Sequence, residues 1–210
     1  MPSDFEETLT AAVTVLRQGG IVAYPAETLF GLGVDPFQEA AVQRLQQLKG
    51  RPAAKSGLIL LLPDWAFLPM VACEPSPLAW RLMRQFWPGP LTLVLSAQPT
   101  LPNWLVGPDR TVAVRIPAAP VAMALLSAWG GPLISTSANR SGLPPARCVE
   151  DVRRLWPSQL YIVPDQGTLF DSGGSPSTLV DLHTDRALLL RAGAIPAAWL
   201  RQWLPDLFEV

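Results

Sequence analysis

Both lysines of this chain fall within seven positions, at Lys49 and Lys55, whereas the other fourteen of its sixteen basic residues are arginine. Arg44 and Arg51 lie in the same stretch, and Ala41–Pro63 contains no acidic residue. Compact ammonium groups and planar guanidinium groups both bind phosphate, each with its own geometry. The stretch therefore predicts a phosphate-binding site.

A second basic stretch runs from Pro75 to Arg147, where six arginines accompany a single acid, Asp109. The net charge of the whole chain is only −1, so the positive charge is concentrated rather than general. If the two stretches converge in the fold, they form a positively charged concave cavity suited to a polyphosphate.

Four segments combine turn-forming residues with polar side chains at the expected ends of strands or helices, where α/β folds carry their functional groups. The four segments are Tyr24–Gly33, Lys49–Lys55, Ser135–Gly142 and Ser175–Thr178. Each also has a simpler interpretation, in the same order: a glycine turn, a basic helix end, an Asn/Ser turn and the start of a strand.

Several common kinds of site are absent from the sequence. It contains no GxxxxGK[ST] phosphate loop, and Gly31-Leu-Gly33 lacks the third glycine of a dinucleotide fingerprint. The one histidine, His183, is expected in a surface turn rather than in a catalytic triad. Cys73 and Cys148 form no CxxC pair, so no zinc site is expected.

The hydrophobic periodicity predicts an α/β (α+β) domain with a twisted mixed sheet and flanking helices. Ser3 and Glu6 form a capping box ahead of a first amphipathic helix, which ends at Gly19-Gly20. The segment Pro25–Gly33 is rich in turn formers. Strands are expected at 21–24, 58–62, 91–95, 111–116, 133–136, 160–163, 178–182 and 188–191, and helices near 42–50, 65–86, 121–129 and 149–155.

Length and composition predict one domain over residues 1–210, with the motifs in a core of about 21–193 and a C-terminal helix over about 196–210. The longest apolar runs are much shorter than the ~20 residues of a membrane-spanning helix. No basic leader precedes an apolar run at the N-terminus. We therefore expect a cytoplasmic protein with no membrane contact.

Seven sequence blocks, in order from Ile21 to Gly193, resemble the YrdC/TsaC family of threonylcarbamoyl-AMP synthases. The family pattern is YPTET-YGLG, KxRP, PGPLT, VRxP, SANxSG, PST and RxG. This chain supplies Tyr24–Thr28 with Phe30–Gly33, Lys49–Pro52, Pro88–Thr92, Val112–Pro117, Ser137–Gly142, Pro176–Thr178 and Arg191–Gly193.

The resemblance implies a reaction in which L-threonine, bicarbonate and ATP give threonylcarbamoyl-AMP and pyrophosphate, with ATP as a substrate and Mg2+ as the accompanying ion. It identifies Lys49, Arg51, Ser137 and Asn139 as the functional tetrad of the family. These types suit the chemistry, because positioning and fixed positive charge can overcome the repulsion between anionic reactants.

The resemblance and the residue types together suggest further roles around this tetrad. Lys55, Arg115 and Arg191 are candidate phosphate or carboxylate ligands. Thr28, Thr92 and Ser177 are the candidates for the threonine end, where reading the substrate hydroxyl requires a hydrogen bond. Glu27 is a candidate for holding magnesium or for orienting the amine.

Two features depart from the family pattern. Ala26 replaces the usual threonine after Tyr-Pro, which leaves open the group that reads the substrate hydroxyl. The length is typical of the short, bacterial members, whereas longer members carry an additional C-terminal domain. Short members depend on other threonylcarbamoyl-transfer proteins to modify tRNA, so partners and tRNA, bound directly or indirectly, are implied.

Two alternatives remain open at this stage. An RNA-binding or ribosome-maturation factor could use the same basic cavity, although few aromatic residues are interleaved with the basic ones. A carbamoyl-transfer domain acting on another amine, as in hydrogenase maturation proteins, is weakened by the absence of acylphosphatase-like and zinc-finger segments.

Overall fold

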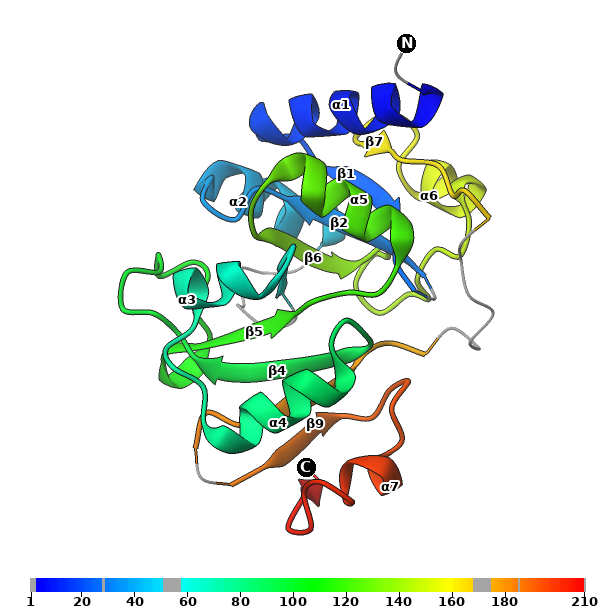
Figure 1. Ribbon diagram of the computed structural model, residues 1–210. Helices are drawn as coiled ribbons and strands as arrows, with labels where there is room; N and C mark the ends of the chain where they lie inside the picture. The colour runs from blue at the N-terminus through cyan, green and yellow to red at the C-terminus, as the bar shows by residue number, and fades with distance from the viewer. Residues whose placement is uncertain (1–2, 28, 51–57, 168–174, 185, 210) are drawn as a thin grey trace.

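The structure is a computed structural model that describes residues 3–27, 29–50, 58–167, 175–184 and 186–209. Within these residues ten strands form one sheet in the order β10-β9-β8-β4-β5-β3-β6-β2-β1-β7 (Figure 1). The strands are β1 (Val22–Pro25), β2 (Phe30–Val34), β3 (Ile59–Leu61), β4 (Leu91–Ser96), β5 (Thr111–Arg115), β6 (Leu133–Ser137), β7 (Tyr161–Ile162), β8 (Thr178–Asp181), β9 (Leu188–Arg191) and β10 (Phe208–Glu209).

The sheet is mixed, because five neighbouring pairs are antiparallel and four are parallel. The expected α/β fold with a mixed sheet is therefore confirmed. The helices are α1 (Asp4–Arg17), α2 (Glu39–Lys49), η1 (Trp65–Phe67), α3 (Leu68–Val71), α4 (Pro77–Phe86), η2 (Pro108–Arg110), α5 (Pro120–Trp129), α6 (Val149–Leu155) and α7 (Ala197–Leu200). None of the described helices is long and apolar enough to cross a membrane.

The first helix begins where the sequence predicts. The Ser3 hydroxyl accepts a hydrogen bond from the Glu6 N–H, and the Glu6 carboxylate accepts one from the Ser3 N–H, which completes the capping box. The apolar stripe of α1 is buried together with α5 against β1, β3 and β6. Figure 1 shows α1 and α5 side by side next to β1 and β6. One face of the sheet is thus covered at its β1 end.

The opposite face carries the larger core, to which α2 and α4 contribute Leu45 and Leu82. Strand residues alternate between the two cores, as the two-residue repeat of a strand requires: Ala23 packs in the larger core, and Val22 and Tyr24 pack in the other. Both faces of the central strands are therefore mainly apolar. Polar side chains lie mostly near the strand ends, with Ser135 in the middle of β6 as an exception.

Part of the turn-rich segment is a strand, which corrects the expectation from its composition. β2 is fully buried, and β1 and β6 pair with it on either side, so its backbone is bonded on both edges. Its two glycines leave room on one face: a Cβ on Gly31 would lie 3.2 Å from the Tyr24 Cζ, and one on Gly33 would lie 3.0 Å from the Tyr24 Cε1. The Tyr24 ring occupies that room.

The C-terminal segment also differs from the expected helix. Within the described residues up to 209, α7, one turn long, is the only helix after Pro196, and β10 follows it and pairs with β9 in parallel. Pro205 explains part of the difference, because a residue before proline is disfavoured in the helical conformation. In Figure 1 this end lies at the edge of the molecule opposite α1.

Candidate active site

A cavity of about 160 Å3 lies where the ends of β1, β5, β6 and β9 approach one another. Its wall combines two arginines, one glutamate and several hydroxyls with apolar side chains. The lining residues are Ala26, Glu27, Leu29, Phe30, Gly31, Ile59, Leu61, Arg115, Ser135, Thr136, Ser137, Pro176, Ser177 and Arg191. Such a wall suits an anionic ligand.

The end of α2 meets the end of β6 through Lys49. Its ammonium group donates hydrogen bonds to the Ser137 carbonyl and, over 3.0 Å, to the Asn139 Oδ1. The Ser137 hydroxyl donates to the same Oδ1 over 2.6 Å, and the Asn139 amide N–H donates to the Leu143 carbonyl. Three of the four residues of the predicted tetrad are therefore in direct contact.

The sequence accounts for the position of Lys49. It is the last residue of α2, where a cation interacts favourably with the helix dipole, and Gly50 ends the helix in the left-handed conformation with φ of 65°. Lys49 is 2% exposed and lies outside the cavity lining, whereas Ser137 is part of it. The fourth member of the tetrad, Arg51, lies outside the described residues, as do Lys55 and Thr28.

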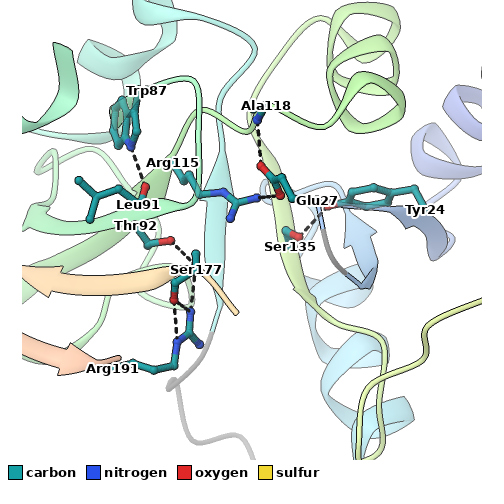
Figure 2. A network of polar contacts seen from close by, with 10 residues as sticks. All are labelled: Tyr24, Glu27, Trp87, Leu91, Thr92, Arg115, Ala118, Ser135, Ser177 and Arg191. Atoms are coloured by element: carbon teal, nitrogen blue, oxygen red, sulfur yellow. Dashed lines mark hydrogen bonds and ion pairs between the residues drawn. The ribbon is translucent and has the colours of Figure 1, made fainter. Parts of the chain in front are cut away.

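Arg115 and Glu27 form a buried ion pair across one wall of the cavity (Figure 2). Arg115 ends β5, and Glu27 lies in the connection between β1 and β2. The other oxygen of the Glu27 carboxylate accepts a hydrogen bond from the Ala118 N–H over 2.9 Å. Among the described residues the Nε of Arg115 is buried without a hydrogen-bond partner.

The same contacts bear on magnesium. Both oxygens of Glu27 already have partners, Arg115 and the Ala118 N–H. Within the described part of the chain no three His, Cys, Asp or Glu side chains form a metal-binding cluster. Magnesium usually binds through one or two carboxylates together with phosphate oxygens and water, and in this structure the Glu27 carboxylate is engaged by Arg115 and the Ala118 N–H.

Arg191 and Ser177 form a second part of the wall. The guanidinium donates to the Ser177 carbonyl from Nε over 3.1 Å and from a terminal nitrogen over 2.9 Å, and that nitrogen also donates to the Ser177 hydroxyl over 3.0 Å. Burial, and then the positive charge of Arg115, lowers the pKa of Arg191 below its usual value. The two arginines are thus close enough for their charges to interact.

Two backbone features bring Arg191 to this wall. The pairing of β8 with β9 is irregular, because Leu179 lies opposite Arg191 whereas the next residue, Val180, lies opposite Leu189. The extra residue, Leu190, is typical of a β-bulge, which redirects the side chain that follows. Gly193 then passes so close to the Ser177 segment that a Cβ would lie 2.3 Å from the Pro176 carbonyl oxygen.

Thr92 reaches the cavity only through Ser177. It is fully buried in β4, its hydroxyl lies 2.8 Å from that of Ser177, and it is not part of the lining. Of the three residues expected at the threonine end, the structure therefore places Ser177 in the wall and Thr92 behind it.

Two residues of the site have no individual role in the sequence interpretation. The Tyr24 hydroxyl donates a hydrogen bond over 2.7 Å to the Ser135 hydroxyl, which lines the cavity (Figure 2). Burial raises the pKa of Tyr24 well above its usual value, so the phenol is neutral. Both residues lie in segments that the sequence singles out. Their contact across β2 cannot be predicted from the sequence, because it depends on the order of the strands in the sheet.

A second cavity, of about 280 Å3, adjoins the first and shares Ile59 and Arg191 with it. Most of its wall is apolar, with Leu58, Val94 and Leu105 among its residues. His183 also lines it and lies in the expected turn after β8, where its Nδ1 is 2.6 Å from the Asp181 carboxylate. The two cavities together offer a charged end and an apolar end.

The family model for Sua5/YciO/YrdC, described as telomere recombination, matches residues 14–193. A threonylcarbamoyl-AMP synthase of Halorhodospira halophila is 48% identical over 150 residues, which are 71% of this chain and 78% of the relative. One from Escherichia coli K12 is 40% identical over 182 residues, 85% of this chain and 93% of the relative.

Among solved structures, P. abyssi Sua5 complexed with L-threonine superimposes with a TM-score of 0.90 at 32% identity. That match covers 100% of this chain but only 61% of the longer P. abyssi chain. The order of the sequence blocks, the fold and these comparisons agree, and the chain belongs to the Sua5/YciO/YrdC family.

Proposed function

We propose that this protein is a threonylcarbamoyl-AMP synthase, which converts L-threonine, bicarbonate and ATP into threonylcarbamoyl-AMP and pyrophosphate. The observation that carries the proposal is the cavity in which Arg115 and Arg191 lie with the hydroxyls of Ser135, Ser137 and Ser177. Two guanidinium groups and three hydroxyls match the carboxylate and phosphate oxygens of the reactants. The membership of the family and the relatives that bear this name support the same activity.

The chemistry requires two new bonds. The threonine amine attacks carbon dioxide derived from bicarbonate, loses a proton and becomes a carbamate. A carbamate oxygen then attacks the α-phosphorus of ATP, and the bond to pyrophosphate breaks. The protein holds three anionic groups together and balances the charge that develops on the leaving group.

The residues have different roles, which follow from where they lie in the site. Arg115, with its unused Nε, and Ser177 bind the threonine carboxylate or carbamate. The ammonium of Lys49 fixes Asn139 and the end of β6, so that the Ser137 hydroxyl can turn from Asn139 to a substrate oxygen. Arg51 is assigned to the phosphates by its place in the family motif, and Lys55 by its charge in the same basic stretch.

The adjoining cavity supports the assignment of ATP. Its apolar wall offers a nucleobase the surface that it needs, and Arg191 lies at the boundary, where phosphates would sit. ATP enters as its magnesium complex, since magnesium usually binds through phosphate oxygens and water. We further propose that other threonylcarbamoyl-transfer proteins carry the product to tRNA.

The proposal is tested by pyrophosphate release from ATP with purified protein, bicarbonate, magnesium and one amino acid at a time. We expect release with L-threonine and much less with L-valine, which lacks the hydroxyl. Absence of threonine-dependent release would overturn the proposal. Salt-sensitive RNA binding without such release would favour the RNA-binding alternative instead.

The variant Lys49→Met tests the cation cluster. It keeps the length of the side chain but removes the charge, so we expect pyrophosphate release to fall at least tenfold, about 1.4 kcal/mol of transition-state stabilisation. The matched control is Arg154→Met, because that side chain is 77% exposed and remote from the cavity lining. An unchanged rate in Lys49→Met would remove this lysine from the mechanism.

A further inference from the structure

A buried hydroxyl pair connects β4 to the cavity. The hydroxyl of Thr92, which is 0% exposed, lies 2.8 Å from the hydroxyl of Ser177, and either oxygen could be the donor from distance alone. Among the described residues the Thr92 hydroxyl has no hydrogen-bond partner other than Ser177. The direction of this hydrogen bond decides what Ser177 can offer to a ligand.

Arg191 donates one of the hydrogen bonds that the Ser177 hydroxyl oxygen accepts. Its guanidinium group lies 3.0 Å from the Ser177 hydroxyl oxygen and can only donate. One of the two lone pairs of that oxygen is therefore occupied. Two further bonds from Arg191, both to the Ser177 carbonyl, keep the arginine in place on the same residue.

The burial of Thr92 decides the direction of its hydrogen bond with Ser177. If Ser177 donated to Thr92, the proton of Thr92 would point into the protein with no acceptor among the described residues, and folded proteins avoid unsatisfied buried donors. If Thr92 donates to Ser177, the buried proton of Thr92 has an acceptor, and the one donor left in the cluster is the Ser177 hydroxyl itself. Both lone pairs of Ser177 are then occupied, and its own proton must be donated to a partner elsewhere.

We infer that Thr92 is a positioning residue that turns Ser177 into a dedicated hydrogen-bond donor facing the cavity. Ser177 lines the cavity, so its hydroxyl can donate its proton to an acceptor oxygen of a bound ligand. A hydroxyl that only donates here binds an acceptor, such as an oxygen of a carboxylate or phosphate, and rejects an ammonium group, which cannot accept. The Ser177 wall is therefore the anionic end of the site, and the identity of the anion rests on the proposed function.

The direction of the bond can be observed without any assay of activity. Neutron diffraction of the deuterated wild-type protein locates the deuteron between the two oxygens. We expect it on Thr92 and pointing at Ser177, with the Ser177 deuteron turned to the cavity. A deuteron on Ser177 that points at Thr92 would overturn the inference, whatever the enzyme does.

Activity tests the consequence through two variants of one position. Thr92→Val removes the donor with little change in volume, and Thr92→Ser keeps it. We expect kcat/KM for threonine-dependent pyrophosphate release to fall about tenfold in Thr92→Val and to stay within about twofold in Thr92→Ser, since one oriented hydrogen bond is at stake. Equal losses in both variants, or no loss in either, would contradict the positioning role.

A double-mutant cycle separates this role from general packing. In a Ser177→Ala background, Thr92→Val should cause no further loss, because Thr92 acts only through Ser177; an additive loss would overturn the inference. A rise in KM for threonine identifies the carboxylate as the acceptor, and a rise in KM for ATP identifies a phosphate. Wild-type protein without threonine-dependent release would count against the proposed function, while the neutron result would still decide the direction of the bond.

Discussion

The two arginines that line the cavity are held in different ways. Arg115 is paired with the carboxylate of Glu27, so its charge is balanced inside the protein. Arg191 is held by the neutral oxygens of Ser177, and within the described residues it forms no ion pair. Arg115 therefore acts mainly as a hydrogen-bond donor of fixed geometry, whereas the positive charge of Arg191 is left to be balanced by a ligand.

This difference shows how one cavity can serve two kinds of anion. A balanced arginine with an unused Nε can orient a carboxylate without adding net charge. An unbalanced arginine, whose pKa is lowered by burial and by Arg115, gains most from a phosphate that compensates it. We therefore expect the two walls to respond differently when their supporting contacts are removed.

The largest effect is expected from Glu27→Ala. It leaves the buried guanidinium of Arg115 without its carboxylate, and the free energy of unfolding should fall by about 3 kcal/mol. Chemical denaturation measures the change, with Glu150→Ala as the control because Glu150 is exposed on α6. A loss no larger than that of the control would mean that the ion pair does not support this wall.

Gly193→Ala should disturb the other wall alone. The added Cβ would lie 2.3 Å from the Pro176 carbonyl oxygen and 2.6 Å from the Ser177 carbonyl carbon, and backbone atoms cannot rotate away. We expect about 2 kcal/mol of lost stability and a rise in KM for ATP.

Gly131→Ala is the matched control for this change, since the nearest atom to its Cβ would be 3.6 Å away. If Gly193→Ala kept the stability and the KM values of the control, the close approach of the Arg191 segment to Ser177 would be irrelevant to the site.

Tyr24→Phe is the smallest of these changes. It removes one hydroxyl, which donates to Ser135 on the cavity wall, so the free energy of unfolding should fall by about 1 kcal/mol. The ring still fills the room over Gly31 and Gly33. Thermal unfolding and the KM for threonine measure the two consequences. A loss several times larger would show that Tyr24 does more than orient Ser135.

The sequence predicts the elements of this fold well where local chemistry decides them. The capping box at Ser3, the glycine that ends α2 and the alternating residues of β5 all act through neighbours in the chain. The glycine-rich β2 is not predicted, because its stability comes from strands on both sides and from the ring of Tyr24.

The candidate site divides in the same way. Lys49, Ser137 and Asn139 are named by ordered motifs, and the structure brings them into contact. The pairing of Glu27 with Arg115 cannot be predicted, since β2, β6 and β3 separate β1 from β5 in the sheet. Nothing in the sequence reveals that Ser177 lies between Thr92 and the cavity.

The most direct measurement of the central claim is the identity of the product. The protein is incubated with ATP, L-threonine and carbon-13 bicarbonate, and the nucleotides are separated and analysed by mass spectrometry. We predict threonylcarbamoyl-AMP with the label in its carbamoyl carbon, and a strongly reduced yield from Arg191→Ala protein that remains folded. An unlabelled product, no such product, or an undiminished yield from Arg191→Ala would contradict the account.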